Sequence, residues 1–318
     1  MTVLVTGASG FIGSALCERL LSEGVSVRGA VRTLDKCPRL IDKVAIGGLT
    51  PNTDWTTSLR GVRLVVHLAA RVHVMNKSRA NELVEFRRAN VEVTAALARQ
   101  AAAAGVRRFI FLSSVKVNGE FTGAGLPFRA GDEPRPADPY GVSKYEAEEF
   151  LHQIGAETGM EVVIIRPPLV YGPGVKANFA SLVHWLSRGL PLPLAAVTKN
   201  RRSMVALDNL VDLVVLCMNH PAAANQIFLV SDGEALSTAE LCVRLATALG
   251  RPHRLFYFPP ILLKSMSWLV NRRDVYDRLC GSLEIDDAKT RDLLCWSPPT
   301  SINEGFHRAG KSFAKVTE

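Results

Sequence analysis

Apolar residues in the first half of the chain form short consecutive runs, and between these runs they recur at helical spacing. Consecutive apolar positions bounded by glycine, proline or polar residues are typical of strands that are buried on both faces. The expected strands are residues 2–6, 25–31, 44–46, 64–68, 109–112 and 162–165. Because helical patterns separate these runs, the sequence predicts strand–helix–strand units and a parallel sheet.

Two helices between these strands carry clear signals. Apolar residues recur every four positions from Ile12 to Leu20, and Gly24 follows at a C-terminal cap position. A longer helix is expected over residues 80–104, ending at the next glycine. Strands and helices together predict an α/β fold, namely a Rossmann-type doubly wound parallel sheet.

The pattern changes after Arg166. Prolines and glycines at 167–168 and 172–174 are expected to break any regular element there. Helices are then expected over 179–187, 209–218 and 238–249, and a strand over 226–230. We predict a nucleotide-binding domain over residues 1–165. Residues 166–318 form a smaller, mainly substrate-binding α/β part, from which some segments return to the sheet.

Composition narrows the function classes. The chain has 318 residues, of which 47% are apolar and 21% charged, as in ordinary soluble proteins. Its net charge is +8, but the basic residues are scattered in short pairs, which disfavours a nucleic-acid partner. Six cysteines lie far apart without a Cys-x-x-Cys pair. We therefore expect no metal site, no disulfide framework and a cytoplasmic location.

Apolar stretches are too short for a membrane span. None approaches the roughly 18 consecutive residues that a spanning helix needs, so we expect no stable membrane insertion. Residues 259–270 are nevertheless apolar enough to touch a membrane surface. Packing of this stretch over the substrate site is the favoured interpretation.

Glycines mark a possible cofactor site. Gly7, Gly10 and Gly13 stand between the first strand and the first helix, where such residues permit a tight turn and close approach of a phosphate. The turn predicts a seat for a dinucleotide pyrophosphate. Arg32 ends the second strand, where an arginine can hold the 2′-phosphate of NADP or simply be solvated. We expect NADP(H), with NAD(H) possible.

A tyrosine and a lysine suggest proton transfer. Tyr140 and Lys144 lie one helical turn apart, so the phenol and the ammonium share one face. The ammonium and a positive nicotinamide ring are expected to lower the pKa of the phenol. Ser113 and Ser114 close the strand at 109–112, where a hydroxyl can bind a substrate carbonyl or cap the strand. The combination predicts carbonyl–alcohol redox chemistry.

The order and spacing of these motifs resemble the extended short-chain dehydrogenase/reductase family, which contains nucleotide-sugar epimerases, dehydratases and reductases. Residues 67–70, 89–94, 112–114 and 166–174 also match that family. The resemblance implies that Tyr140 is the general acid/base and that Lys144 lowers its pKa and binds the nicotinamide ribose. It also implies that Ser114 orients the carbonyl.

The resemblance extends to binding residues. The expected cofactor contacts are Gly7, Gly10, Phe11, Ile12, Gly13, Arg32, Leu49, Leu68, Ala69, Ala70, Asn90, Tyr140, Lys144, Pro167 and Val170. The expected contacts to a UDP-sugar substrate are Ser114, Asn178, Arg202 and Arg278. A homodimer is expected through a four-helix interface, built from helix 80–104 and the helix after Tyr140.

Departures from the family pattern guide the choice of reaction. Asn118 replaces a tyrosine that is usual in epimerases, and Ser114 lacks the carboxylate pair that follows it in dehydratases. With Arg32, this favours reduction at C4 of a UDP-4-keto-6-deoxy-N-acetylhexosamine, a quinovosamine type of step in bacterial surface-polysaccharide synthesis. The alternative is a 4-epimerase of UDP-hexoses or UDP-N-acetylhexosamines that retains NAD. A catalytically silent nucleotide-binding protein is disfavoured because Tyr140 and Lys144 are both present.

Overall fold

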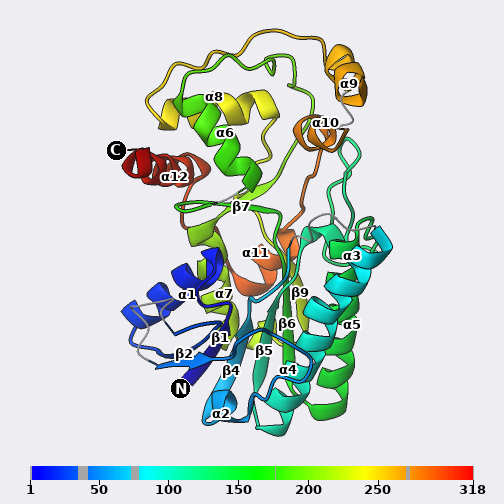
Figure 1. Cartoon of the computed structure of the whole chain (residues 1–318), viewed down its shortest axis with the longest axis vertical. Helices are drawn as coiled ribbons and strands as arrows, with labels where there is room; N and C mark the ends of the chain where they lie inside the picture. Colours follow the sequence, from blue (N-terminus) through cyan, green and yellow to red (C-terminus); the bar gives the residue numbers. More distant parts are fainter. Residues whose placement is uncertain (1, 35–41, 73–78, 176, 270–272, 318) are drawn as a thin grey trace.

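A parallel sheet organises the molecule. The computed structural model describes residues 2–34, 42–72, 79–175, 177–269 and 273–317. Within these residues, seven parallel strands form one sheet in the order β3-β2-β1-β4-β5-β6-β9 (Figure 1). The strands are β1 (Thr2–Thr6), β2 (Ser26–Val31), β3 (Asp42–Ala45), β4 (Val62–His67), β5 (Arg108–Leu112), β6 (Glu161–Arg166) and β9 (Gln226–Leu229). The strand order reverses between β1 and β4, where open α/β sheets bind ligands.

Helices cover both faces of the sheet, which confirms the predicted doubly wound fold (Figure 1). On one face, Leu16 and Leu210 belong to the same apolar core. On the other face, Leu97 and Leu151 pack in a second core. The helices on the sheet are α1 (Phe11–Ser22), α2 (Thr56–Leu59), α3 (Arg79–Phe86), α4 (Val93–Ala103), α5 (Pro139–Thr158) and α7 (Leu207–Asn219).

The helix expected over 80–104 contains an irregularity. α3 and α4 are joined by the π-helical segment η1 (Arg87–Glu92), so the helical path continues with one wider turn inside it. The side-chain pattern alone does not reveal such a turn, because a single inserted residue only slightly shifts helical periodicity. The expected helix is thus present, but its regularity was overestimated.

The C-terminal part adds a second layer above the sheet. β7 (Leu169–Tyr171) and β8 (Met204–Ala206) pair in parallel, and the helices beside them share a third core. The other elements of this part are the 3-10 turn η3 (Pro221–Ala223), α6 (Ala177–Ser187), α8 (Thr238–Ala248), α9 (Pro260–Leu269), α10 (Arg273–Cys280), α11 (Ala288–Leu294) and α12 (Ile302–Thr317). Earlier in the chain, the 3-10 turn η2 (Val115–Val117) lies between β5 and α5. The sequence did not predict β7, which fits between the two expected breaks at residues 167–168 and 172–174.

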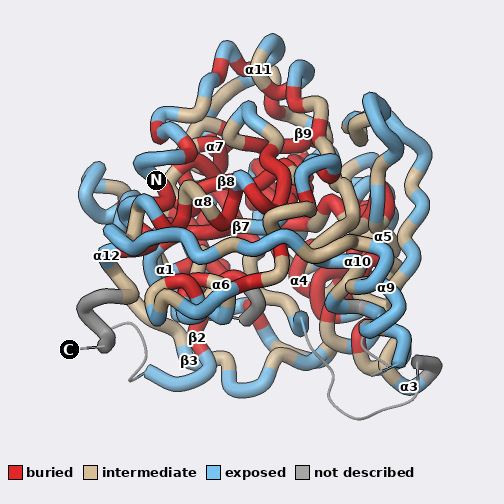
Figure 2. The backbone as a smooth tube through the Cα atoms, turned by 90° about the horizontal axis from the view of Figure 1, so that it is seen from above, coloured by how far each residue is buried: buried red, intermediate tan, exposed pale blue. Residues whose placement is uncertain are grey.

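Two segments after residue 166 return to the main sheet. β9 pairs with β6, and α7 packs on the same face as α1. Burial is concentrated around the sheet and the third core, whereas α9 lies at the periphery of the view in Figure 2. No helix in the described part of the chain is both long enough and apolar enough to cross a membrane.

Candidate active site

The glycine turn after β1 is closely packed. Gly7 has a φ of +67°, and the amide of Gly10 donates to the Gly7 carbonyl at 2.8 Å. A Cβ at Gly13 would lie 2.1 Å from the Gly7 carbonyl oxygen, so only glycine fits there. Gly10 is the N-terminal cap of α1, and no side chain of the described residues makes a capping hydrogen bond there. The first amides of α1 therefore remain available to an anion. The turn therefore fits a dinucleotide pyrophosphate.

A buried hydroxyl–imidazole chain braces this turn against β4. The amides of Leu68 and Ala69 each donate to Thr6 Oγ1 at 3.2 Å, and Thr6 Oγ1 lies 2.7 Å from His67 Nδ1. Thr94 Oγ1 donates to the Asn90 carbonyl, so its 3.0 Å contact with His67 Nε2 requires that nitrogen to donate. Burial, with a smaller effect of Lys144, lowers the pKa of His67 to about 3, consistent with a neutral ring.

Asn90 connects two parts of the site from within η1. Its Nδ2 donates to the Arg71 carbonyl and to Ser143 Oγ, at 3.0 and 3.1 Å. Its Oδ1 accepts from the Arg71 amide at 2.8 Å. Ser143 Oγ in turn donates to the Tyr140 carbonyl at 2.8 Å. Asn90 is buried, so these contacts fix the loop after β4 against the start of α5.

Tyr140 stands in the first turn of α5. Asp138 caps this helix, accepting from the Gly141 amide at 2.6 Å, and Pro139 occupies the first turn. The Tyr140 ring packs edge-on against Phe86, with centroids 5.9 Å apart. Burial, and then the Asp138 carboxylate, raise the pKa of the Tyr140 phenol above its usual value.

Lys144 lies one turn further along α5 and is buried. Its ammonium donates to the Leu112 carbonyl at 2.7 Å and lies 4.3 Å from the Phe111 ring centroid. Burial lowers the pKa of Lys144 to about 7, although the nearby Glu148 carboxylate opposes that shift. The distance from Lys144 Nζ to the Tyr140 ring centroid is 6.0 Å.

In the chain by itself the pKa of the Tyr140 phenol is raised, so the expected lowering by Lys144 and the nicotinamide ring stays a prediction for the complex with the cofactor. Spacing correctly places the two groups on one helix face, but it carries no information on desolvation. Burial disfavours the charged form of both groups, raising the pKa of the phenol and lowering that of the ammonium. A lower pKa of the Tyr140 phenol would require a positive charge on a bound ligand.

The two serines after β5 have different surroundings. Ser113 is buried, and its hydroxyl donates to Glu148, which also forms a buried ion pair with Arg166 at 2.5 Å. Ser114 is half-buried and caps η2, accepting from the Lys116 amide at 3.2 Å. Ser113 is thus committed to the interior, which leaves Ser114 as the candidate to face a substrate.

A charged cluster beside Ser114 was not expected from the sequence. Lys116 Nζ pairs with Asp138 and lies 3.1 Å from Glu120, which links the serine loop to the cap of α5. A side chain at Gly141 would come within 2.8 Å of the Lys116 carbonyl, so loop and helix touch directly. The sequence signal that could have indicated this contact is Asp138, which stands three positions before Gly141 at the start of the helix.

Arg202 is brought close to the end of α10. Its Nη1 donates to the Gly281 carbonyl at 3.0 Å, and its backbone bridges to Leu236. Burial lowers the pKa of Arg202, with Glu120 acting in the opposite direction. Arg278 lies in the last turn of α10, three residues before Gly281. The two expected diphosphate ligands thus approach the same corner of the molecule.

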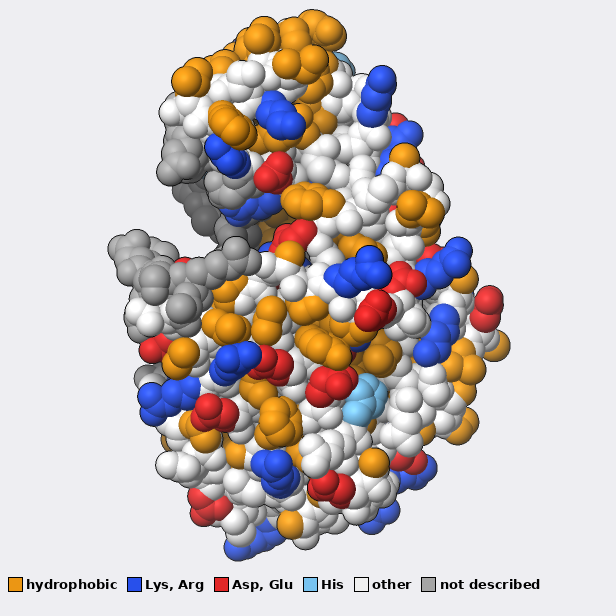
Figure 3. Space-filling model, turned by 90° about the vertical axis from the view of Figure 1, so that its right-hand side faces the viewer, with side chains coloured by type: hydrophobic (Ala, Val, Ile, Leu, Met, Phe, Trp, Pro, Cys, Tyr) orange, Lys and Arg blue, Asp and Glu red, His pale blue; other side chains and the backbone are white. Residues whose placement is uncertain are grey.

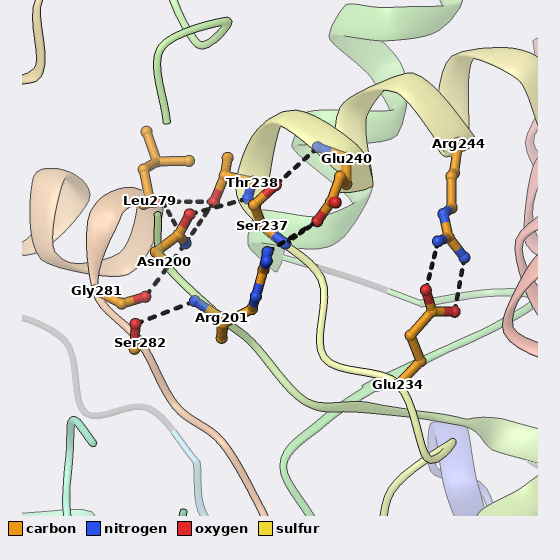
Figure 4. Close-up of polar contacts among 10 residues, drawn as sticks. All are labelled: Asn200, Arg201, Glu234, Ser237, Thr238, Glu240, Arg244, Leu279, Gly281 and Ser282. Carbon is orange, nitrogen blue, oxygen red and sulfur yellow. Dashed lines mark hydrogen bonds and ion pairs between the residues drawn. The ribbon is translucent and has the colours of Figure 1, made fainter. Parts of the chain in front are cut away.

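Polar contacts hold this corner together, as Figure 4 shows. Asn200 donates to Thr238 Oγ1 at 3.0 Å and to the Leu279 carbonyl at 3.3 Å, while Thr238 Oγ1 donates to the same carbonyl at 2.5 Å. The Arg201 amide donates to Ser282 Oγ at 3.0 Å. The start of α8 therefore fixes the segment that carries Arg202 against the end of α10.

The remaining predicted contacts are distributed around these elements. Arg32 is exposed immediately after β2, and Leu49 packs partly buried against the second core. Pro167 accepts a hydrogen bond from the Val115 amide at 3.0 Å, which fixes it beside η2. Val170 lies half-buried in β7. Asn178 is in α6, but its side chain lies outside the described part of the structure.

Comparison with known proteins places this site in a family. The model of the NAD dependent epimerase/dehydratase family matches residues 3–231. The chain belongs to this family. A UDP-glucose 4-epimerase from Vibrio cholerae is 46% identical over 317 residues, covering 99% of this chain and 96% of that protein. The chain is therefore an NAD-dependent enzyme of the short-chain dehydrogenase/reductase type, which confirms the predicted family.

Solved structures of similar proteins agree with the fold. MoeE5 in complex with UDP-glucose and NAD has a TM-score of 0.80 and 25% identity, with 100% of each chain covered. A UDP-glucose 4-epimerase from Thermotoga maritima has a TM-score of 0.79 at 23% identity, which supports the fold alone. The cofactor in the MoeE5 structure is NAD, so these comparisons give no support to the expected preference for NADP.

Proposed function

We propose that this enzyme interconverts a UDP-hexose or UDP-N-acetylhexosamine and its C4 epimer, and retains NAD during the cycle. The observation that carries the proposal is the 46% identity, over 99% of the chain, with a UDP-glucose 4-epimerase. The geometry supports it, because Tyr140, Lys144 and Ser114 lie around the carboxyl end of β5, on the same sheet edge as the glycine turn. The reduction of a 4-keto sugar, which the sequence motifs favoured, has no comparable support from this relative.

The chemistry requires a proton to leave and return at one oxygen. When bound, NAD supplies the hydride acceptor for C4 of the sugar and the donor that returns the hydride to the other face. Tyr140 takes the proton of the C4 hydroxyl as the ketone forms and gives it back as the alcohol re-forms. Ser114 Oγ holds that oxygen, and protonated Lys144 stabilises the phenolate. No net oxidation results.

Substrate binding is assigned to the C-terminal part. Arg202, with its guanidinium held at the Gly281 carbonyl, neutralises the diphosphate of the nucleotide, assisted by Arg278 and Asn178. The burial of Arg202 strengthens this interaction, because fewer water molecules compete for the charge. The UDP group would thus be anchored at one end of the site while the sugar reaches Tyr140.

A second candidate function rests on Arg32. Its exposed position immediately after β2 suits the 2′-phosphate of NADP and hence a consumable reductant for a 4-keto sugar. Denaturing the purified enzyme and identifying the released cofactor separates the two reactions. We expect bound NAD and epimerisation of UDP-glucose or UDP-N-acetylglucosamine by NMR. Consumption of NADPH with a UDP-4-keto-6-deoxy sugar, without epimerisation, would establish the reductase instead.

The catalytic assignment has its own test. We expect Tyr140→Phe to lower kcat by roughly 100- to 10,000-fold, the range for loss of a general acid/base, while NAD still co-purifies. Tyr145→Phe is the matched control, because Tyr145 lies on the same helix and is expected to leave kcat unchanged. Near-normal turnover in Tyr140→Phe would refute the mechanism.

A further inference from the structure

The outer face of α9 is apolar. Leu262, Met266 and Leu269 recur at i, i+4 and i+7, and Ile261 and Trp268 lie beside them on the same side of the helix. The exposed fractions of Ile261, Trp268 and Leu269 are 77%, 58% and 85%. Within the described residues, α9 contains no buried residue. These five residues, with exposed Tyr257, are called the α9 patch.

This arrangement is the reverse of a soluble amphipathic helix. Leu263 points the other way and packs against the third core, so α9 is attached to the protein by its narrower apolar side. Hydrophobic side chains gather at the end of the molecule that holds α9, with Lys and Arg among them (Figure 3). Apolar surface gathered in this way marks an interaction site rather than ordinary surface variation.

The charged residues of the chain segment that carries the α9 patch are all positive. Residues 241–273 contain six Lys or Arg and no Asp or Glu. Lys264 lies within α9, and the Arg273 guanidinium stacks on Trp268 at 3.5 Å from the ring centroid. Arg251 and Arg254 are also exposed in the preceding segment. The patch is therefore complementary to a surface that is both apolar and anionic.

We propose that the α9 patch docks this protein reversibly on an anionic lipid surface, with α9 lying in the plane of the headgroups. Tryptophan, tyrosine and basic residues around an aliphatic face are the composition that binds at a bilayer interface. The inference does not depend on the proposed reaction.

A hollow beside α9 also supports an anionic lipid as the ligand. It has a volume of about 460 Å³ and is lined by Lys264, Ser265, Trp268 and Leu269. A cation and a hydroxyl next to two apolar side chains match a lipid, whose anionic headgroup adjoins its acyl chains. Figure 1 shows α9 at the end of the C-terminal part that points away from the main sheet.

Vesicle flotation with the full chain tests the proposal. We expect the protein to float with vesicles of equimolar phosphatidylcholine and phosphatidylglycerol, and much less with phosphatidylcholine alone or at high salt. Lys264→Gln is expected to weaken binding roughly fivefold, the effect of removing one cation near an anionic surface. The double substitution Trp268→Ser with Leu269→Ser is expected to abolish flotation. Leu21→Ser, on α1 at the other end of the molecule, is the control and should float normally.

Two results would overturn the proposal. One is failure of the wild-type protein to float with the anionic vesicles, and the other is undiminished flotation of the double variant. Thermal unfolding of each variant shows whether it is folded, and brominated lipid should quench the fluorescence of the wild type more than that of Trp268→Phe. If light scattering shows that the double variant changes subunit assembly while the wild type does not float, α9 contacts a second copy instead.

Discussion

At the scale of single residues, burial dominates the chemistry of the site. Lys144 has to stabilise a phenolate in the proposed reaction, yet it is buried against Phe111 and the carbonyl of Leu112. Its pKa of about 7 means that a substantial fraction of it is uncharged near neutral pH. Glu148, four residues further along α5, favours the charged form. The charged form of Lys144 is therefore retained at a cost in folding free energy.

This cost predicts how stability depends on pH. In the unfolded chain Lys144 regains its ordinary pKa of 10.5, so between about 7 and 10.5 the unfolded state binds more protons than the native state. The contribution of Lys144 to the free energy of unfolding is unfavourable below this window and vanishes as pH rises through it. Lys144→Met removes the group and should flatten this rise.

Urea unfolding of wild type and Lys144→Met at several pH values between neutrality and pH 10.5 measures the effect. The difference between the two proteins isolates Lys144, because buried thiols such as Cys217, whose pKa burial raises to about 12, contribute equally to both. We expect the variant to gain stability relative to wild type at neutral pH and to lose that advantage towards high pH. Parallel pH profiles would contradict the assignment.

At the scale of elements, the π-helical segment η1 places Asn90 where a regular helix would not. The wider turn brings its amide to Arg71 and Ser143 at once. Ser143 then holds the carbonyl of Tyr140. π-helical turns are frequent at functional sites for this reason, since they redirect one side chain without ending the helix. Asn90 is thus a positioning residue for the start of α5.

Asn90→Asp tests that role with little change in shape. The carboxylate can still accept from the Arg71 amide but loses both donors, to the Arg71 carbonyl and to Ser143. Each buried group left unsatisfied costs about 1–3 kcal/mol, so the free energy of unfolding should fall by at least that amount. We expect kcat to fall as well, with KM for the UDP-sugar nearly unchanged.

Chemical denaturation and steady-state kinetics give both readouts. Asn219→Asp, at the exposed C-terminal end of α7, is the matched control and should leave both values within experimental error. Loss of stability without any loss of kcat would show that Asn90 is structural only. An increase in KM alone would instead place it in substrate binding.

Local pattern predicted most elements but not the interactions between them. The strands lie within about two residues of the expected positions, because buried parallel strands and glycine-capped helices leave strong local signals. β7 was missed because a three-residue strand carries no usable periodicity. The raised pKa of Tyr140 and the commitment of Ser113 to Glu148 could not be predicted either, since both depend on burial among residues distant in sequence.

At the scale of the whole molecule, one half-buried carboxylate joins the two parts. Asp232 accepts from Tyr171 of β7 at 2.7 Å, from the Ala206 amide of β8 at 2.9 Å and from Asn209 of α7 at 2.7 Å. Burial raises the pKa of Asp232, although these donors oppose the shift. Because β9, which precedes Asp232, belongs to the main sheet, this cluster fixes β7, β8 and α7 to that sheet. The proposed epimerisation needs that fixed relation between both ligands.

We place the expected dimer interface on the layer formed by α3, α4 and α5. On its outer side Val84 is 64% exposed and Phe150 is 39% exposed, while Arg87 and Glu146 form a bidentate ion pair between η1 and α5. In a two-fold dimer the same patch meets itself, so both copies of Phe150 would lie within one interface. We therefore expect Phe150→Glu to bury a charge in each half of the interface and to dissociate the dimer.

Light scattering coupled to gel filtration measures this outcome against the chain mass of 34.6 kDa. The wild type should have twice that mass, Phe150→Glu should have the mass of a single chain, and Leu269→Ser in the α9 patch should remain dimeric. Because Phe150 is partly exposed and the substitution leaves the interior unchanged, the monomer should stay folded. A monomeric wild type, or a dimeric Phe150→Glu, would contradict the four-helix interface, and monomerisation by Leu269→Ser would move the interface to α9.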